Sequence, residues 1–115
     1  MTTKLYAQGD IILELVEDAR PSNLLPGDPD GATVLARGEL TGHRHAFYER
    51  GVTFFRDDAL ARELPPGLYL GHVRIDALSA DLRHEEHATI TLPAGTYRVR
   101  RQREWDGSSD MLIWE

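Results

Sequence analysis

The sequence contains no cysteine. Disulfide bonds are therefore excluded, and so is a thiolate ligand to a metal ion. Any tightly held metal would have to be bound through nitrogen and oxygen atoms, which narrows the ligand residues to histidine, aspartate and glutamate.

Long hydrophobic runs are also missing. No apolar stretch approaches the roughly 20 residues that a transmembrane helix needs. The first ten residues, MTTKLYAQGD, lack the long apolar core of a signal peptide. We therefore expect a cytoplasmic protein with no membrane partner.

An excess of positive charge is absent as well, because the formal net charge at pH 7 is −6. Proteins that bind nucleic acid over their whole surface usually present an excess of lysine and arginine, so this class is disfavoured, although a local basic stripe is compatible with the composition. The 115 residues are 41% hydrophobic and 28% charged, an ordinary globular composition. We expect a single domain over residues 1–115.

The pattern along the chain is mostly that of β-strands. Hydrophobic residues alternate from Ile11 onward, which predicts one long first strand within residues 4–19. We expect turns at residues 92–97 and 106–110. The further predicted strands lie within residues 33–49, 52–56, 67–75, 87–92, 95–105 and 111–115.

Two segments depart from the strand pattern. Residues 20–32 are dense in proline and glycine and predict a long exposed loop. Residues 57–64 begin with acidic side chains, carry a short apolar stripe and stop before two prolines, which predicts a short helix. Together these elements predict an all-β fold: a small antiparallel barrel, roll or sandwich with one short helix.

The first group of candidate functional residues lies in LTGHRHAFYERG, residues 40–51. Side chains two apart on a strand share a face, so His43, His45 and Glu49 would point the same way. Two imidazoles and a carboxylate on one face can converge on a divalent ion.

The second group is HEEH, where His84 and His87 flank Glu85 and Glu86. Positions three apart face opposite ways on a strand, so both histidines reach one site only from a helical turn or a bend. Such a turn could be capped by Ser79 or Asp81. The two glutamates are candidate catalytic acid/base groups or outer partners of a metal site.

We therefore expect a site for a divalent metal ion such as Zn, Fe, Mn or Ni. Four histidine ligands would suit a structural or storage site, whereas three ligands with one open position would leave room for water and for hydrolytic or oxidative chemistry. For His72, which stands alone, we expect a structural or solvated role. The predicted ligands are His43, His45, Glu49, His84 and His87.

Two alternatives to a metal protein follow from the arginines. The first is a nucleic-acid-binding or accessory protein, because arginines beside an aromatic residue can hold phosphates and stack a base. A second interpretation of the same arginine-rich strand is structural. Its charges would prevent edge-to-edge pairing with another sheet, or would form ion pairs with carboxylates of the chain. The candidate contacts are Arg98, Arg100, Arg101 and Arg103.

The second alternative is a metal-independent enzyme that cleaves phosphodiesters. One neutral and one protonated histidine would act as base and acid, and an arginine such as Arg44, Arg83 or Arg98 would stabilise the developing charge. The ligand on these interpretations is an unidentified small molecule or nucleic acid. Exposed strand edges also make a homodimer compatible with the sequence.

Part of the sequence resembles the cupin metal motifs. His43, His45 and Glu49 are similar in order and spacing to the first motif, in which two histidines two apart are followed by a glutamate. The PAG at residues 93–95 resembles the proline and glycine that open the second motif.

The chain departs from the cupin pattern at two positions. In cupins the second motif supplies a histidine three residues after the glycine, where this chain has Arg98, and the glycine expected after the glutamate is displaced to Gly51. The resemblance therefore implies a cupin-like metal centre with a substituted fourth ligand from His84 or His87.

The chain as a whole looks like a group of short, uncharacterised bacterial and phage proteins. That resemblance implies one complete unit and carries no activity. The segments that support it are QGD at residues 8–10, TGHRH at 41–45, HEEH at 84–87 and PAGTYRVRRQRE at 93–104.

Overall fold

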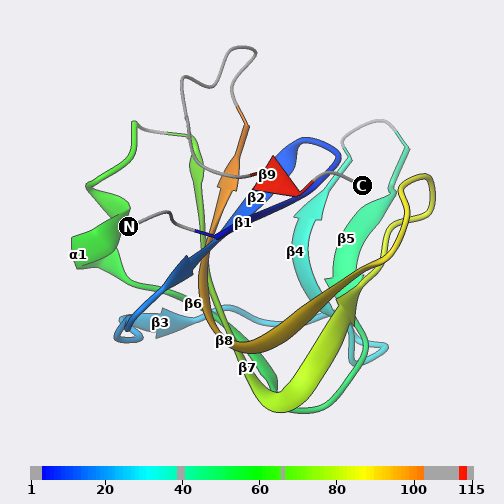
Figure 1. Cartoon of the computed structure of the whole chain (residues 1–115), viewed down its shortest axis with the longest axis horizontal. Coiled ribbons are helices and arrows are strands. Elements are labelled where there is room, and N and C mark those ends of the chain that lie inside the picture. Colours follow the sequence, from blue (N-terminus) through cyan, green and yellow to red (C-terminus); the bar gives the residue numbers. More distant parts are fainter. Residues whose placement is uncertain (1–3, 39–40, 66, 103–111, 114–115) are drawn as a thin grey trace.

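The structure is a computed structural model that describes residues 4–38, 41–65, 67–102 and 112–113 (Figure 1). The predicted turn at 106–110 and the arginine at 103 lie outside these residues. No helix in the described ranges is long and apolar enough to cross a membrane.

The chain starts with a hairpin of β1 (Leu5–Gln8) and β2 (Ile11–Val16). The prediction of one long strand over residues 4–19 is therefore wrong. Gly9 has a φ of 60°, a left-handed conformation that glycine adopts readily, and it reverses the chain between the two strands. The alternation from Ile11 onward belongs to β2 alone.

The predicted short helix is confirmed as α1 (Asp58–Ala61). Asp57 caps it, because its Oδ1 accepts hydrogen bonds from the backbone N–H groups of Ala59 and Leu60 at 3.1 and 3.2 Å. The helix follows β6 (Val52–Arg56), which pairs with the short β3 (Asn23–Leu24) inside the predicted loop.

The longest strands are β7 (Tyr69–Leu82) and β8 (Ile90–Arg101), which form one antiparallel hairpin. The predicted turn at residues 92–97 is wrong, since β8 continues through Pro93–Gly95. Proline lacks a backbone donor, and the strand tolerates Pro93 beside an irregularity in the pairing between Ile75 and Ser79.

The expectation that Ser79 or Asp81 caps a helical turn is also wrong, because both residues lie within β7. Residues 85–87 form a bend at the tip of the β7–β8 hairpin instead.

The strands form an open roll. The larger sheet has the order β3-β6-β7-β8-β2-β1-β9 and is antiparallel except where β1 runs parallel to β9 (Leu112–Ile113). A second sheet pairs β4 (Thr33–Arg37) with β5 (Arg44–Phe47). The described strands do not close into a barrel; β7 and β8 curve so that their far ends lie beside β5 (Figure 1).

The hydrophobic core lies inside this curve. Phe47 from β5 is fully buried with Leu82 of β7 and Tyr97 of β8. The burial of each large apolar side chain contributes roughly 1.5–3 kcal/mol to the free energy of unfolding. This packing holds β5 against the β7–β8 hairpin. It therefore fixes the start of β5 relative to the tip of that hairpin.

Candidate metal centre

Three chain segments meet at one end of the roll: the β1–β2 turn, the start of β5 and the tip of the β7–β8 hairpin. The backbones of Ala46 and Arg83 exchange hydrogen bonds of 3.0 and 2.9 Å, which join β5 to the end of β7. In Figure 1 the yellow tip of the hairpin lies next to β5. Both predicted histidine pairs are carried by these segments.

The structure brings the four paired histidines together. The ring centroid of His84 lies 5.6 Å from that of His43, 4.3 Å from that of His45 and 4.6 Å from that of His87. The bend at the hairpin tip places His84 and His87 on the same side, although they are three residues apart. We call His43, His45, His84 and His87 the histidine cluster.

Within the described residues, one group of ligand atoms converges closely enough to hold a metal ion. It consists of His43, His84 and Glu85, whose ligand atoms all lie within 4.8 Å of one another. The Nδ1 atom of His84 accepts a hydrogen bond of 3.0 Å from the backbone N–H of Glu86, which leaves Nε2 as the ligand atom.

Glu85 is held in its ionised form. Its Oε1 accepts a hydrogen bond of 2.9 Å from the backbone N–H of Arg44, and this bond lowers the pKa of the carboxyl below its usual value. Glu85 is thus an anionic oxygen donor beside two imidazoles.

Burial keeps two of the histidines neutral. It lowers the pKa of His45 to about 4, and electrostatic repulsion between the His45 and His84 rings in their protonated forms lowers it further. Burial also lowers the pKa of His84, and the charge of His87 adds to that effect. Only the neutral imidazole can bind a metal, so the environment favours the form that a ligand requires.

A buried glutamine fixes the orientation of His45. The side-chain amide of Gln8 donates to the carbonyls of Leu82 and Ala88 at 2.8 and 2.9 Å, on either side of the hairpin tip. Its Oε1 lies 2.9 Å from Nδ1 of His45. Because the amide hydrogens are used elsewhere, His45 must donate from Nδ1, which leaves Nε2 as the acceptor nitrogen of the neutral ring.

Asp10 lies beside the same nitrogen. Its Oδ1 is 3.6 Å from Nε2 of His45, and its Oδ2 accepts a hydrogen bond of 2.9 Å from Arg101. Sequence reasoning did not assign site roles to Gln8 or Asp10. The signal that could have found them is the QGD at residues 8–10, which was among the segments of the resemblance to short bacterial and phage proteins.

The other predicted acidic residues have different surroundings. The carboxylate of Glu49 accepts hydrogen bonds from the backbone N–H groups of Asp81 at 2.7 Å and Tyr48 at 3.2 Å. It is not part of the convergent group defined above. Glu86 is exposed, and its Oε1 lies 3.6 Å from Nδ1 of His43.

His72 lies outside the histidine cluster, in the middle of β7. It is fully buried, and its Nδ1 accepts a hydrogen bond of 2.6 Å from the hydroxyl of Tyr69, which in turn accepts from the backbone N–H of Asp57. Burial lowers the pKa of His72 to about 4. These contacts correspond to the structural role expected for it.

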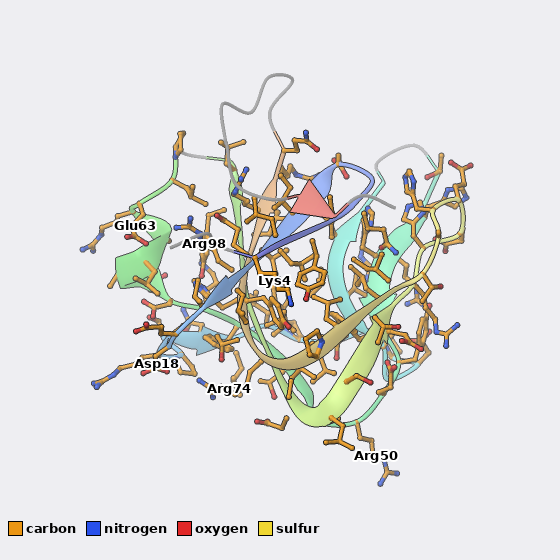
Figure 2. The ribbon with its side chains drawn as sticks, in the orientation of Figure 1. Lys4, Asp18, Arg50, Glu63, Arg74 and Arg98 are labelled. Carbon is orange, nitrogen blue, oxygen red and sulfur yellow. The ribbon has the colours of Figure 1, made fainter. Side chains whose placement is uncertain are left out.

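The predicted nucleic-acid contacts that the structure describes form ion pairs. The Nε atoms of Arg98 and Arg100 both donate to Glu14 at 2.9 Å, and Arg98 also contacts Glu63 near α1 (Figure 2). Arg101 donates to the carboxylate at position 10. Arg103 lies outside the described residues.

Comparison with known proteins places the chain in a family without an assigned activity. No curated protein and no solved structure matches it. Residues 7–102 match the family described as a domain of unknown function, DUF8820. This matched range includes all four residues of the histidine cluster. The chain therefore belongs to the DUF8820 family.

Proposed function

We propose that this protein binds a divalent metal ion at His43, His84 and Glu85, and that the ion is a reactive centre. The observation that carries the proposal is the convergence of two imidazole nitrogens and one carboxylate oxygen within 4.8 Å. The rings of the other two residues of the histidine cluster lie beside that of His84, at centroid distances of 4.3 and 4.6 Å.

The number of ligands favours reactivity over a purely structural role. Structural zinc sites take four protein ligands, whereas catalytic sites take three and leave a position for water or substrate. Two histidines and one carboxylate are also the donor set of non-haem iron(II) oxygenases. The identity of the bound metal would therefore decide between hydrolytic and oxidative chemistry.

A hydrolytic reaction would use the ion and one further carboxylate. A bound zinc ion would lower the pKa of a coordinated water to about 7. Glu86 is exposed and close to His43, so it is the group that we assign as the acid/base partner. Its place outside the convergent group leaves it free to exchange protons with solvent.

The proposal modifies the cupin-like ligand set. The donor types are those that the resemblance implies, but the carboxylate comes from Glu85 in place of Glu49, whose oxygens are engaged by backbone N–H groups. The proposed metal site is thus assembled from the residue before β5 and from the hairpin tip, not from one strand.

Elemental analysis of protein purified without a histidine tag tests the proposal. We expect at least one divalent ion per chain in the wild type and one ion fewer in the double variant His43→Ala, His84→Ala. The variant Glu49→Gln is the matched control and should keep the wild-type metal content. Absence of metal from the wild type, or equal metal in the double variant, would contradict the proposed function.

A further inference from the structure

We propose that Gln8 is a positioning residue of the metal centre. Its side-chain amide holds together the two ends of the bend that carries His84 and Glu85, and it thereby raises the affinity of the site for the ion. This inference rests on the proposed function, because it concerns the same ligands. Gln8 acts through the backbone of the bend and is not itself a ligand.

The bend lies beyond the regular pairing of the hairpin. The last backbone pair of the β7–β8 ladder joins Leu82 to Ile90. Residues 83–89 lie between these two positions and outside both strands, and they carry His84 and Glu85. A segment outside a ladder lacks its regular backbone hydrogen bonds, so its shape depends on contacts from other parts of the chain.

Gln8 supplies such contacts at both ends of the bend. Its side-chain nitrogen donates to the carbonyl of Leu82 at 2.8 Å and to that of Ala88 at 2.9 Å. One amide group therefore joins the residue before the bend to a residue that follows both ligands. Gln8 is fully buried, so water does not compete for these hydrogen bonds.

The oxygen of the same amide reaches the histidine cluster. It lies 2.9 Å from Nδ1 of His45, and the ring centroid of His45 lies 4.3 Å from that of His84. The bend is joined to β5 as well, because Glu85 accepts a hydrogen bond from the backbone N–H of Arg44. Gln8 adds a connection to β1, so the two ligands are held from two different strands.

This arrangement sets an expectation for metal affinity. Ligands that are held in place before the ion arrives lose less conformational freedom when it binds. Groups that orient metal ligands from outside typically change the affinity by about 10–100-fold when they are replaced. Without Gln8, the carbonyls of Leu82 and Ala88 lose their shared donor, and the bend between them is free to adopt other conformations. Metal binding should then weaken although every ligand is still present.

Titration of chelator-treated protein with Co²⁺ tests this role, because the visible absorption of the bound ion reports both its affinity and its coordination geometry. We expect Gln8→Met to bind Co²⁺ about 10–100-fold more weakly than the wild type and with an altered spectrum. Gln102→Met is the matched control. It makes the same substitution at a glutamine whose side chain forms no hydrogen bond with the other described residues, and it should bind Co²⁺ as the wild type does.

Urea denaturation and circular dichroism show whether each variant is folded under the conditions of the titration. If Gln8→Met does not fold, Gln8→Asn takes its place, because it keeps the amide on a side chain too short to reach both carbonyls. The same weakening and the same change of spectrum are expected. Failure of both variants to fold would assign Gln8 to the stability of the whole fold and would overturn the positioning role.

The outcomes separate the two proposals. Co²⁺ binding that is lost in the variant His43→Ala, His84→Ala but unchanged in affinity and spectrum in folded Gln8→Met would overturn the positioning role and leave the proposed function standing. Equal weakening in Gln102→Met would also overturn the positioning role. No Co²⁺ binding by the wild type would overturn both.

Discussion

At the scale of single residues, the histidines could be predicted from the sequence and their partners could not. The spacing of His43 and His45 indicated a shared site, and the structure places their rings near His84. Gln8 gave no such indication, because its role depends on the backbone carbonyls of Leu82 and Ala88, which are distant from it in the sequence. A glutamine fixes the tautomer of a histidine only when both of its amide hydrogens are already donated to other groups, so that only its oxygen can face the ring.

Glu49 shows the opposite case. A period-two pattern aligned it with the histidines, but β5 ends at Phe47, so the regular alternation does not extend to residue 49. Its carboxylate satisfies backbone N–H groups of two chain segments instead. The carboxylate of the convergent group comes from Glu85, which no periodicity in the sequence related to His43.

His72 gives a prediction for the pH dependence of stability. The pKa of His72 is about 4 in the folded protein, below the ordinary histidine value of 6.5, because burial disfavours the charged ring. Between these values the unfolded chain binds more protons, so stability falls as the pH is lowered from 6.5 toward 4. One pKa unit corresponds to about 1.4 kcal/mol, and the full loss from this group is roughly 3 kcal/mol.

Chemical denaturation with chelator present measures this effect. Acidification from pH 7 to 4.5 should destabilise the wild type more than His72→Gln, which keeps an acceptor for Tyr69 but does not titrate. His45 contributes equally in both proteins, so the difference in slope isolates His72. Identical pH slopes for the two proteins would contradict the assignment.

At the scale of elements, local patterns predicted the strands but not their continuity. The predicted strand at residues 52–56 and the helix near residues 57–64 correspond to β6 and α1. The alternation predicts a strand through the glycine and aspartate after Gln8, yet they form a turn. The local sequence predicts a turn at Pro93 and Gly95, yet both continue β8. At Pro93 the long-range pairing with β7 decided the outcome over local preference, whereas the turn at Gly9 closes a hairpin between neighbouring strands.

The packing of β2 against β8 gives a prediction for the arginine-rich segment. Glu14 of β2 is largely buried and accepts hydrogen bonds from Arg98 and Arg100 of β8, both at 2.9 Å. Removing Glu14 takes away the largely buried carboxylate that both arginines share. We expect Glu14→Gln to lower the free energy of unfolding by about 3 kcal/mol.

Urea denaturation of Glu14→Gln checks this expectation, with Glu17→Gln as the control on the same segment. Glu17 is exposed, and its substitution should change stability by less than about 0.5 kcal/mol. Equal stability of the two variants would show that the arginines of β8 do not depend on Glu14.

At the scale of the whole molecule, the sequence limited the fold to an all-β barrel, roll or sandwich, and the structure is an open roll. The choice among these depends on the bend of β7 and β8, where the pairing is irregular between Ile75 and Ser79. That bend also carries the hairpin tip to β5. The same feature that leaves the roll open therefore assembles the histidine cluster from segments about 40 residues apart in sequence.

Anomalous diffraction from crystals grown with Zn²⁺ locates a bound ion among named side chains and so distinguishes the proposed site from any other. We expect an anomalous peak in contact with His43, His84 and Glu85. A peak bound only elsewhere on the molecule, or a cluster without a peak in zinc-saturated crystals, would contradict it.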